Sequence, residues 1–156
     1  MKHTALKLIS MLVLGLLGVL FAAEVSPAET LREQVIGAWT LVSHPYWPDA
    51  VGRLLYAREG QMCVTIMRPD RPKFFAASPY AETVEERVAA AAVTGYFNYC
   101  GSYHVHEEKS LVTYRVDLSL FPNWVGTQQV DFISMSGDQL TWRGAIGRSI
   151  VWERLR

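Results

Sequence analysis

The chain has 156 residues with 15 basic and 15 acidic side chains, so its formal net charge is zero at pH 7. This balance provides no electrostatic footprint for binding nucleic acid or an anionic membrane surface. Two cysteines are too few for a zinc site unless histidines contribute. A chain of this length corresponds to one domain.

The first 28 residues are typical of a secretory signal peptide, because two lysines precede the uncharged stretch Leu8–Ala23. Small residues predict cleavage after Ala28, with cleavage after Ala23 or an uncleaved N-terminal anchor as alternatives. Cleavage after Ala28 leaves 13 basic and 14 acidic residues, a net charge of −1. We therefore expect residues 29–156 to form a periplasmic or extracellular domain that does not contact a membrane.

The mature chain begins with a predicted short helix at residues 29–35, where Thr30 and Glu33 have the spacing of a capping box. Apolar and β-branched residues then predict three strands, the last two joined by a tight turn. These strands are expected at residues 36–43, 52–57 and 61–67.

The next segment changes in character. Three prolines, Pro69, Pro72 and Pro79, predict a loop. Thr83 and Glu86 repeat the capping-box spacing, and four consecutive alanines follow. These features predict a helix from Thr83 to about Asn98, inserted between the third and fourth strands.

Strand patterns return after this helix, with the strictest alternation at residues 111–120. Eight short strands joined mostly by hairpins predict an all-β fold, an eight-stranded antiparallel up-and-down barrel that can hold one small ligand. A β-sandwich is the alternative. The remaining strands are expected at residues 102–106, 111–120, 127–136, 139–143 and 149–155.

A disulfide between Cys63 and Cys100 is not the favoured prediction, although export would permit it. If the helix ends near Asn98, the two cysteines lie at opposite ends of the ladder between strands three and four. Their separation is then roughly 15 Å at ~3.3 Å per residue. This distance exceeds the reach of a disulfide.

Four sequence stretches together resemble the bacterial and fungal lipocalin-like domain family. Gly37-Ala38-Trp39 is similar to the Gly-x-Trp start of lipocalins, and the other three are MRPDRPKF (67–74), GYFNYCGSY (95–103) and SLFPNWVGTQQV (119–130). The resemblance covers about residues 35–154 and implies the barrel fold more firmly than a function. Some fungal relatives are associated with isomerisation or cyclisation of small natural products. Similar chains carry His-His where this one has Tyr114-Arg115, so chemistry relying on that histidine is not implied.

The long fifth strand carries a polar strip formed by Arg115, Asp117 and Ser119 on one face. If this face points inward, Asp117 and Arg115 could orient a ligand or act on it as acid and base. If it points outward, the alternating apolar residues from Val112 to Leu120 line the interior. The sequence leaves both arrangements open.

Other polar residues suggest weaker sites. Arg68 and Arg71, held in a proline-rich loop, could bind a carboxylate at the barrel mouth or pair with Asp70. His104 and His106 share a strand face, but no spacing supplies a third metal ligand. We therefore predict neither a metal nor a cofactor.

Phe121 and Trp124 lie on a predicted turn between the fifth and sixth strands. They are expected to plug one end of the barrel or, less favoured, to edge an opening there, since an exposed aromatic pair invites association.

The favoured function is binding of a small, mostly apolar ligand with one polar group by a monomer or weak homodimer. An isomerase or cyclase using Asp117 and Arg115, and a filled barrel with a structural or partner-binding role, are the alternatives. The predicted ligand contacts are Trp39, Met67, Arg68, Tyr96, Tyr103, Arg115, Asp117, Trp124 and Gln129.

Overall fold

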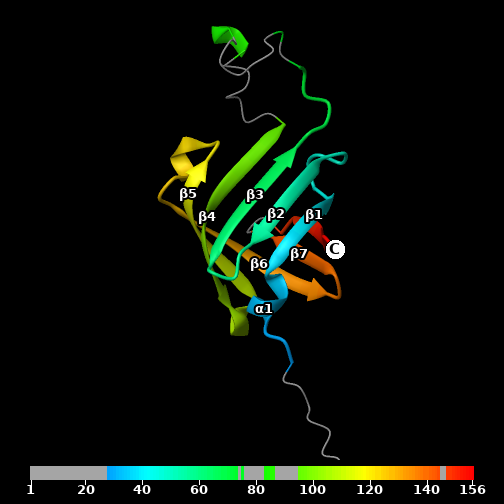
Figure 1. The fold of residues 1–156 in the computed structure, drawn as a ribbon, viewed down its shortest axis with the longest axis vertical. Helices are drawn as coiled ribbons and strands as arrows, with labels where there is room; N and C mark the ends of the chain where they lie inside the picture. Colours follow the sequence, from blue (N-terminus) through cyan, green and yellow to red (C-terminus); the bar gives the residue numbers. More distant parts are fainter. Residues whose placement is uncertain (1–27, 74, 76–82, 87–94, 145–146) are drawn as a thin grey trace, which may run out of the picture.

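Eight antiparallel strands close into a barrel in sequence order, and β1 pairs with β8 (Figure 1). The computed structural model describes residues 28–73, 75, 83–86, 95–144 and 147–156, so the predicted signal segment lies almost wholly outside the described residues. The up-and-down barrel predicted from the sequence is confirmed. The strands are β1 (Gly37–Ser43), β2 (Val51–Tyr56), β3 (Gln61–Met67), β4 (Tyr96–His106), β5 (Leu111–Ser119), β6 (Gln128–Ser136), β7 (Gln139–Arg143) and β8 (Ser149–Arg154).

A short helix, α1 (Leu31–Val35), covers one end of the barrel (Figure 1). The predicted capping box is present, with the Thr30 side chain accepting from the Glu33 backbone and the Glu33 side chain accepting from the Thr30 backbone. The Glu107 carboxylate, in η1 (Glu107–Lys109), also accepts from the backbone N–H groups of Leu31 and Arg32 at 2.9 Å each. These bonds satisfy donors that a helix start leaves unpaired. In the described ranges, no helix is long and apolar enough to cross a membrane.

One arginine side chain reinforces the backbone ladder at the seam between β1 and β8. Trp39 and Arg154 are direct partners across the seam, and the guanidinium lies 4.3 Å from the centre of the indole ring. Arg154 also donates to the backbone carbonyls of Gln34 and Ile36. A side chain at Gly37, whose φ is +137°, would come within 3.0 Å of this guanidinium. Because glycine has no side chain at this position, the Arg154 guanidinium has room to contact both α1 and Trp39.

The fourth strand begins earlier than predicted. Residues 84–86 are helical and the Thr83–Glu86 capping box is present, but Tyr96, Phe97 and Asn98 belong to β4. The prediction of a helix to about Asn98 is therefore wrong at that end, and residues 87–94 lie outside the described residues. Phe97 pairs with Ile66, and buried Tyr99 pairs with Val64. Pairing and burial on the barrel wall thus prevail over the helical pattern of the preceding alanines.

The earlier start of β4 changes the position of the cysteines. Cys63 and Cys100 are direct cross-strand partners with their Cα atoms 4.1 Å apart, and they form a disulfide. The prediction against this bond was wrong because it placed the start of β4 at Ser102, which separated the two residues along the ladder.

A β-bulge interrupts the alternation of β5. Gly101 pairs with Val116 and Cys100 with Leu118, so Asp117 is the extra residue. A Cβ atom at Gly101 would lie 1.9 Å from the carbonyl oxygen of Arg115, and glycine is required by this close approach. The bulge turns Leu118 outward, where it is 65% exposed, so the predicted apolar alternation ends at Val116.

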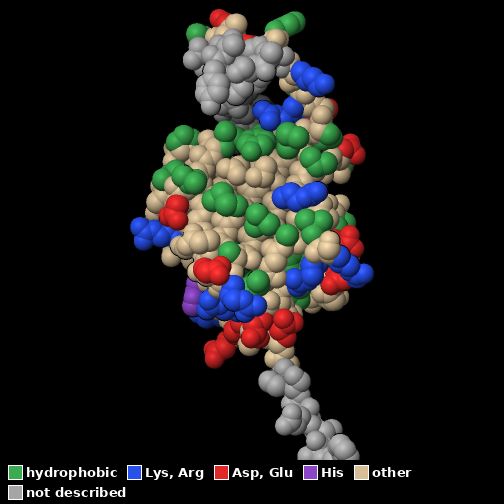
Figure 2. Space-filling view, viewed as in Figure 1, with side chains coloured by type: hydrophobic (Ala, Val, Ile, Leu, Met, Phe, Trp, Pro, Cys, Tyr) green, Lys and Arg blue, Asp and Glu red, His purple; other side chains and the backbone are tan. Residues whose placement is uncertain are grey.

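The outer wall carries an apolar stripe, which we define as Leu55, Cys63, Cys100 and Leu118. Each residue is the cross-strand partner of the next, from β2 to β5. Figure 2 shows hydrophobic side chains spread over this side of the barrel. The disulfide therefore lies on the outer wall and takes up no space in the barrel interior.

Removal of the disulfide is expected to lower the free energy of unfolding by about 4 kcal/mol, because the bond closes a loop with a sequence separation of 37 residues. The Cys63→Ala/Cys100→Ala double variant and the oxidised wild type should be compared by urea unfolding. Dithiothreitol should destabilise the wild type and leave the variant unchanged. A wild type insensitive to dithiothreitol would contradict the assigned bond.

Candidate functional site

A cavity of about 190 Å³ opens at the end of the barrel opposite α1. Antiparallel pairing brings the end of β1, the start of β4, the start of β6 and the β7–β8 connection to this open end. Its walls are largely aromatic, formed by Phe97, Tyr99, Trp124 and Trp142, and its polar groups come from His44, Gln129, Asp131 and Arg148.

Trp124 forms one edge of this cavity. It lies in η2 (Pro122–Trp124) and makes edge-to-face contacts with Phe97 and Tyr99, with ring centres 5.5 and 5.8 Å away. Phe121 contacts Trp124 from outside and is 41% exposed. Of the two predicted arrangements, the structure shows the aromatic pair edging an opening, and the favoured plug was wrong. Phe121 is exposed, whereas Trp124 is half-buried where it lines the cavity.

The floor of the cavity is formed by packed side chains, so the barrel is filled below it. Tyr56 and Tyr114 share a buried hydrogen bond of 2.6 Å between their hydroxyl groups. Burial raises the pKa of both phenols well above the usual value, so both remain protonated at neutral pH. Trp142 packs beside them, and its buried indole N–H makes no hydrogen bond to any described residue.

Asp131 brings a carboxylate into this aromatic environment. It lies on the inward face of β6, opposite Val112, and Oδ1 is 3.5 Å from the position of a Cβ atom at Gly144. Within the described part of the chain, its side chain has no hydrogen-bond or ion-pair partner. Burial raises the pKa of Asp131 from 3.8 to about 6, because the charged form loses solvation.

Two nitrogen-containing side chains lie toward the mouth. His44 Nδ1 accepts from the backbone N–H groups of Tyr46 and Trp47 at 3.4 and 3.2 Å, which leaves the proton of the neutral ring on Nε2. Burial lowers the pKa of His44 and so favours this neutral form. Arg148 lies over the Tyr46 ring, 4.7 Å from its centre.

The structure brings two of the predicted ligand contacts to the cavity, Trp124 and Gln129. Trp39 is fully buried near α1, where its indole N–H donates to the Val35 carbonyl. The Tyr103 hydroxyl donates to the Ala57 carbonyl at the same end. These two aromatics therefore belong to the core beneath the cavity.

Arg115 and Asp117 lie on the outer face of β5 and are exposed, whereas Val112, Tyr114 and Val116 point into the core. The outward arrangement is thus the one adopted. The structure does not bring the Arg115–Asp117 pair to the cavity.

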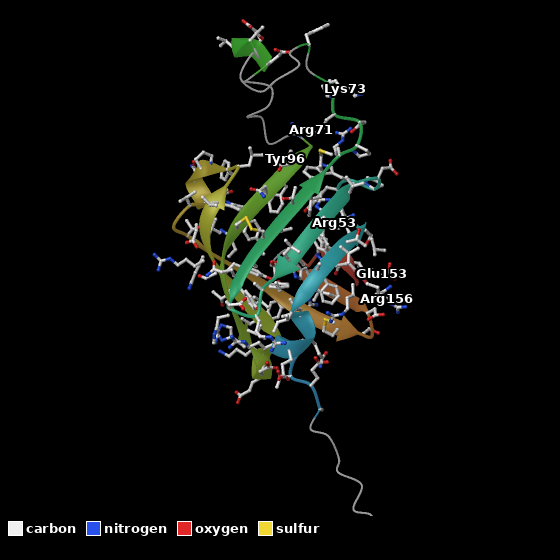
Figure 3. All side chains as sticks on the ribbon, viewed as in Figure 1. Arg53, Arg71, Lys73, Tyr96, Glu153 and Arg156 are labelled. Carbon is white, nitrogen blue, oxygen red and sulfur yellow. A yellow bond between two sulfur atoms is a disulfide. The ribbon has the colours of Figure 1, made fainter. Side chains whose placement is uncertain are left out.

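The remaining predicted contacts lie around the β3–β4 connection. Arg68 pairs with Asp70, as one predicted alternative proposed. Met67 is the strand partner of Tyr96, and Arg71 lies over the Tyr96 ring, 5.1 Å from its centre (Figure 3). These residues form a polar and aromatic rim beside the mouth.

The paired histidines lie on the outer wall. The rings of His104 and His106 are 4.7 Å apart, and His106 Nε2 is 3.0 Å from the Thr113 hydroxyl. Among the described residues, no group of three or more potential metal ligands is present.

Sequence reasoning missed Asp131 and His44. The available signal for Asp131 was its phase on the sixth strand, shared with Ile133, which is buried. That phase was ambiguous because Val130 and Phe132 form an equally apolar set on the opposite face, and both are exposed. His44 follows the first strand, where no periodic pattern indicates its direction.

The chain belongs to the lipocalin-like domain family, whose sequence pattern matches residues 33–154. This confirms the resemblance found in the sequence. The chain is also similar to a protein of Aspergillus oryzae named 4'-hydroxy-3'-methoxypropiophenone carrier protein ppsC. The two are 32% identical over 85 residues, which cover 51% of this chain and 75% of that protein.

The Asp131→Asn variant is expected to be more stable than the wild type above pH 6, by about 2–3 kcal/mol from the rise in pKa from 3.8 to about 6. The folded state binds this proton more tightly than the unfolded chain does. Its contribution to stability is therefore complete below pH 3.8 and is lost as the pH rises through 6.

Urea unfolding of both proteins at pH 4 and pH 7.5 measures this difference, which should be large only at pH 7.5. Asp138→Asn is the matched control with the opposite sign, because Arg156 lowers the pKa of Asp138. Equal stability of Asp131→Asn and wild type at pH 7.5 would show that the Asp131 carboxylate is well solvated.

Proposed function

We propose that this protein binds and carries a small aromatic ligand of one ring in the cavity at the open end of the barrel. The observation that carries this proposal is an aromatic-walled space of about 190 Å³ above a filled core. An apolar cavity of about 150 Å³ accepts benzene. A single ring with short substituents fits the available volume, and larger substituents would extend through the mouth.

The Aspergillus oryzae relative supports the same class of ligand. Its name describes a carrier of 4'-hydroxy-3'-methoxypropiophenone, a single-ring aromatic ketone with polar substituents. A mostly apolar wall with a few polar groups suits such a molecule.

Binding without turnover is favoured over the isomerase or cyclase alternative. That alternative required Arg115 and Asp117 to act on a ligand inside the barrel, and both are exposed on the outer face of β5. The packed core beneath the cavity also sets the greatest depth to which a ligand can enter.

Export is part of the proposal. The uncharged Leu8–Ala23 stretch is typical of a signal peptide, and the Cys63–Cys100 disulfide suits an oxidising compartment. We therefore propose that the carrier acts in the periplasm or outside the cell.

Trp124→Ala should weaken binding of 4'-hydroxy-3'-methoxypropiophenone by about tenfold, since the indole forms one wall of the cavity. Isothermal titration calorimetry on wild type and variant measures this change. Trp124 is only partly buried, so the loss in unfolding free energy should stay below the roughly 3–5 kcal/mol of a core Trp→Ala change.

Phe132→Ala is the matched control, because Phe132 is an exposed aromatic on the outer face of β6. It should bind the ketone as the wild type does. Absence of binding to the wild type, or equal affinities of wild type and Trp124→Ala, would contradict the proposed site.

The N-terminus of the exported protein tests the proposed processing. When the full chain is expressed in a secreting bacterial host, mass spectrometry should find a mature protein that begins at Glu29. Full-length chain retained in the membrane fraction would favour the uncleaved anchor.

A further inference from the structure

The cavity contains a hydrogen-bond acceptor that the fold itself does not use. The inward-facing Asp131 carboxylate lies beside Tyr99 and Trp142 in the cavity wall. No described residue donates a hydrogen bond to it or pairs with its charge. A carboxylate that is largely removed from water without a partner is costly to the folded state, so a ligand that supplies a donor there recovers part of that cost.

Three of the neighbouring polar side chains, those of Tyr56, Tyr114 and His44, already have hydrogen-bond partners. The Tyr56 and Tyr114 hydroxyl groups are joined by their mutual hydrogen bond beneath the cavity. His44 Nδ1 is occupied by two backbone N–H groups near the mouth. Asp131 is a charged acceptor in the cavity lining, so a buried ligand donor gains more there than at a neutral oxygen such as the Tyr99 hydroxyl.

The position of Asp131 below the mouth of the cavity determines which end of the ligand enters first. Asp131 follows Gln129 on the inward face of β6, one step farther from the open end, and buried Ile133 lies one step beyond it. Arg148 and the Nε2–H of His44 lie toward the mouth and can donate to an acceptor on the ligand. The polarity of the cavity thus runs from an acceptor inside to donors at the entrance.

We propose that Asp131 selects ligands that carry a phenolic hydroxyl, which enters first and donates to the carboxylate. This inference rests on the proposed carrier function and specifies its ligand class. A ligand ring without the hydroxyl would shield the carboxylate from water and would donate no hydrogen bond in place of those that water makes. Sites built around a hydrogen bond discriminate strongly against analogues that lack the partner group.

The test compares two ligands of nearly equal size, 4'-hydroxypropiophenone and 4'-methylpropiophenone, by isothermal titration calorimetry at pH 7. The wild type should bind the hydroxyl compound about tenfold more tightly or better, as expected for a hydrogen bond to a charged group. Asp131→Leu should abolish or reverse this preference. Asp131→Asn, which keeps a neutral acceptor, should show a reduced preference and provides the comparison if the leucine variant does not fold.

Asp117→Leu is the matched control, because it makes the same change at an exposed aspartate on the outer wall. It should keep the preference of the wild type. Equal affinities of the two ligands for the wild type, or a hydroxyl preference that survives in both Asp131 variants, would overturn the role of Asp131 and leave the carrier function standing. Failure of both ligands to bind the wild type would overturn the carrier function and this inference together.

Discussion

The contact between Arg154 and Trp39 links closure of the barrel to the position of α1. It joins the last strand to the first, and the same guanidinium holds the carbonyl groups at the end of α1. Because one guanidinium makes both the contact with Trp39 and the hydrogen bonds to α1, closure of the seam and placement of the helix support each other. With that end sealed by α1 and Trp39, side chains fill the interior from below, and space for a ligand remains only toward the opposite end.

The barrel therefore lies between the two structural alternatives, a hollow carrier and a filled scaffold. Its core is packed up to the Tyr56–Tyr114 pair, and the cavity occupies the part above it. The packed part holds the strands in register. Residues of the cavity lining, such as Trp124, Asp131 and His44, can therefore be substituted to change ligand preference while the packed core stays intact. A small cavity above a rigid floor favours short, flat ligands over long ones.

The architecture could be predicted from the sequence because strand period, capping boxes and turn residues agreed with one another. The main error was the start of β4, because the alanine-rich helical pattern was continued through Gly95 to Asn98, although Gly95, at φ +81°, is a residue type that commonly ends a helix. Pairing with β3 then fixes the conformation of Tyr96, Phe97 and Asn98, and the position of Cys100 depends on it. The site was less predictable. Trp124 and Gln129 were found, but Asp131 was not, because both faces of its strand carry apolar residues and a long-range contact selects between them.

The disulfide also has a topological effect. Cys63 and Cys100 enclose the whole connection between β3 and β4 in a covalent ring. A chain cut at any peptide bond inside that ring remains a single molecule, with both strands still tied at the same register. Changes in the length or sequence of the connection likewise leave the disulfide-linked pairing of β3 with β4 in place. A cut in this connection therefore leaves β3 and β4 joined covalently, and Phe97 and Tyr99 of β4 stay in the cavity wall.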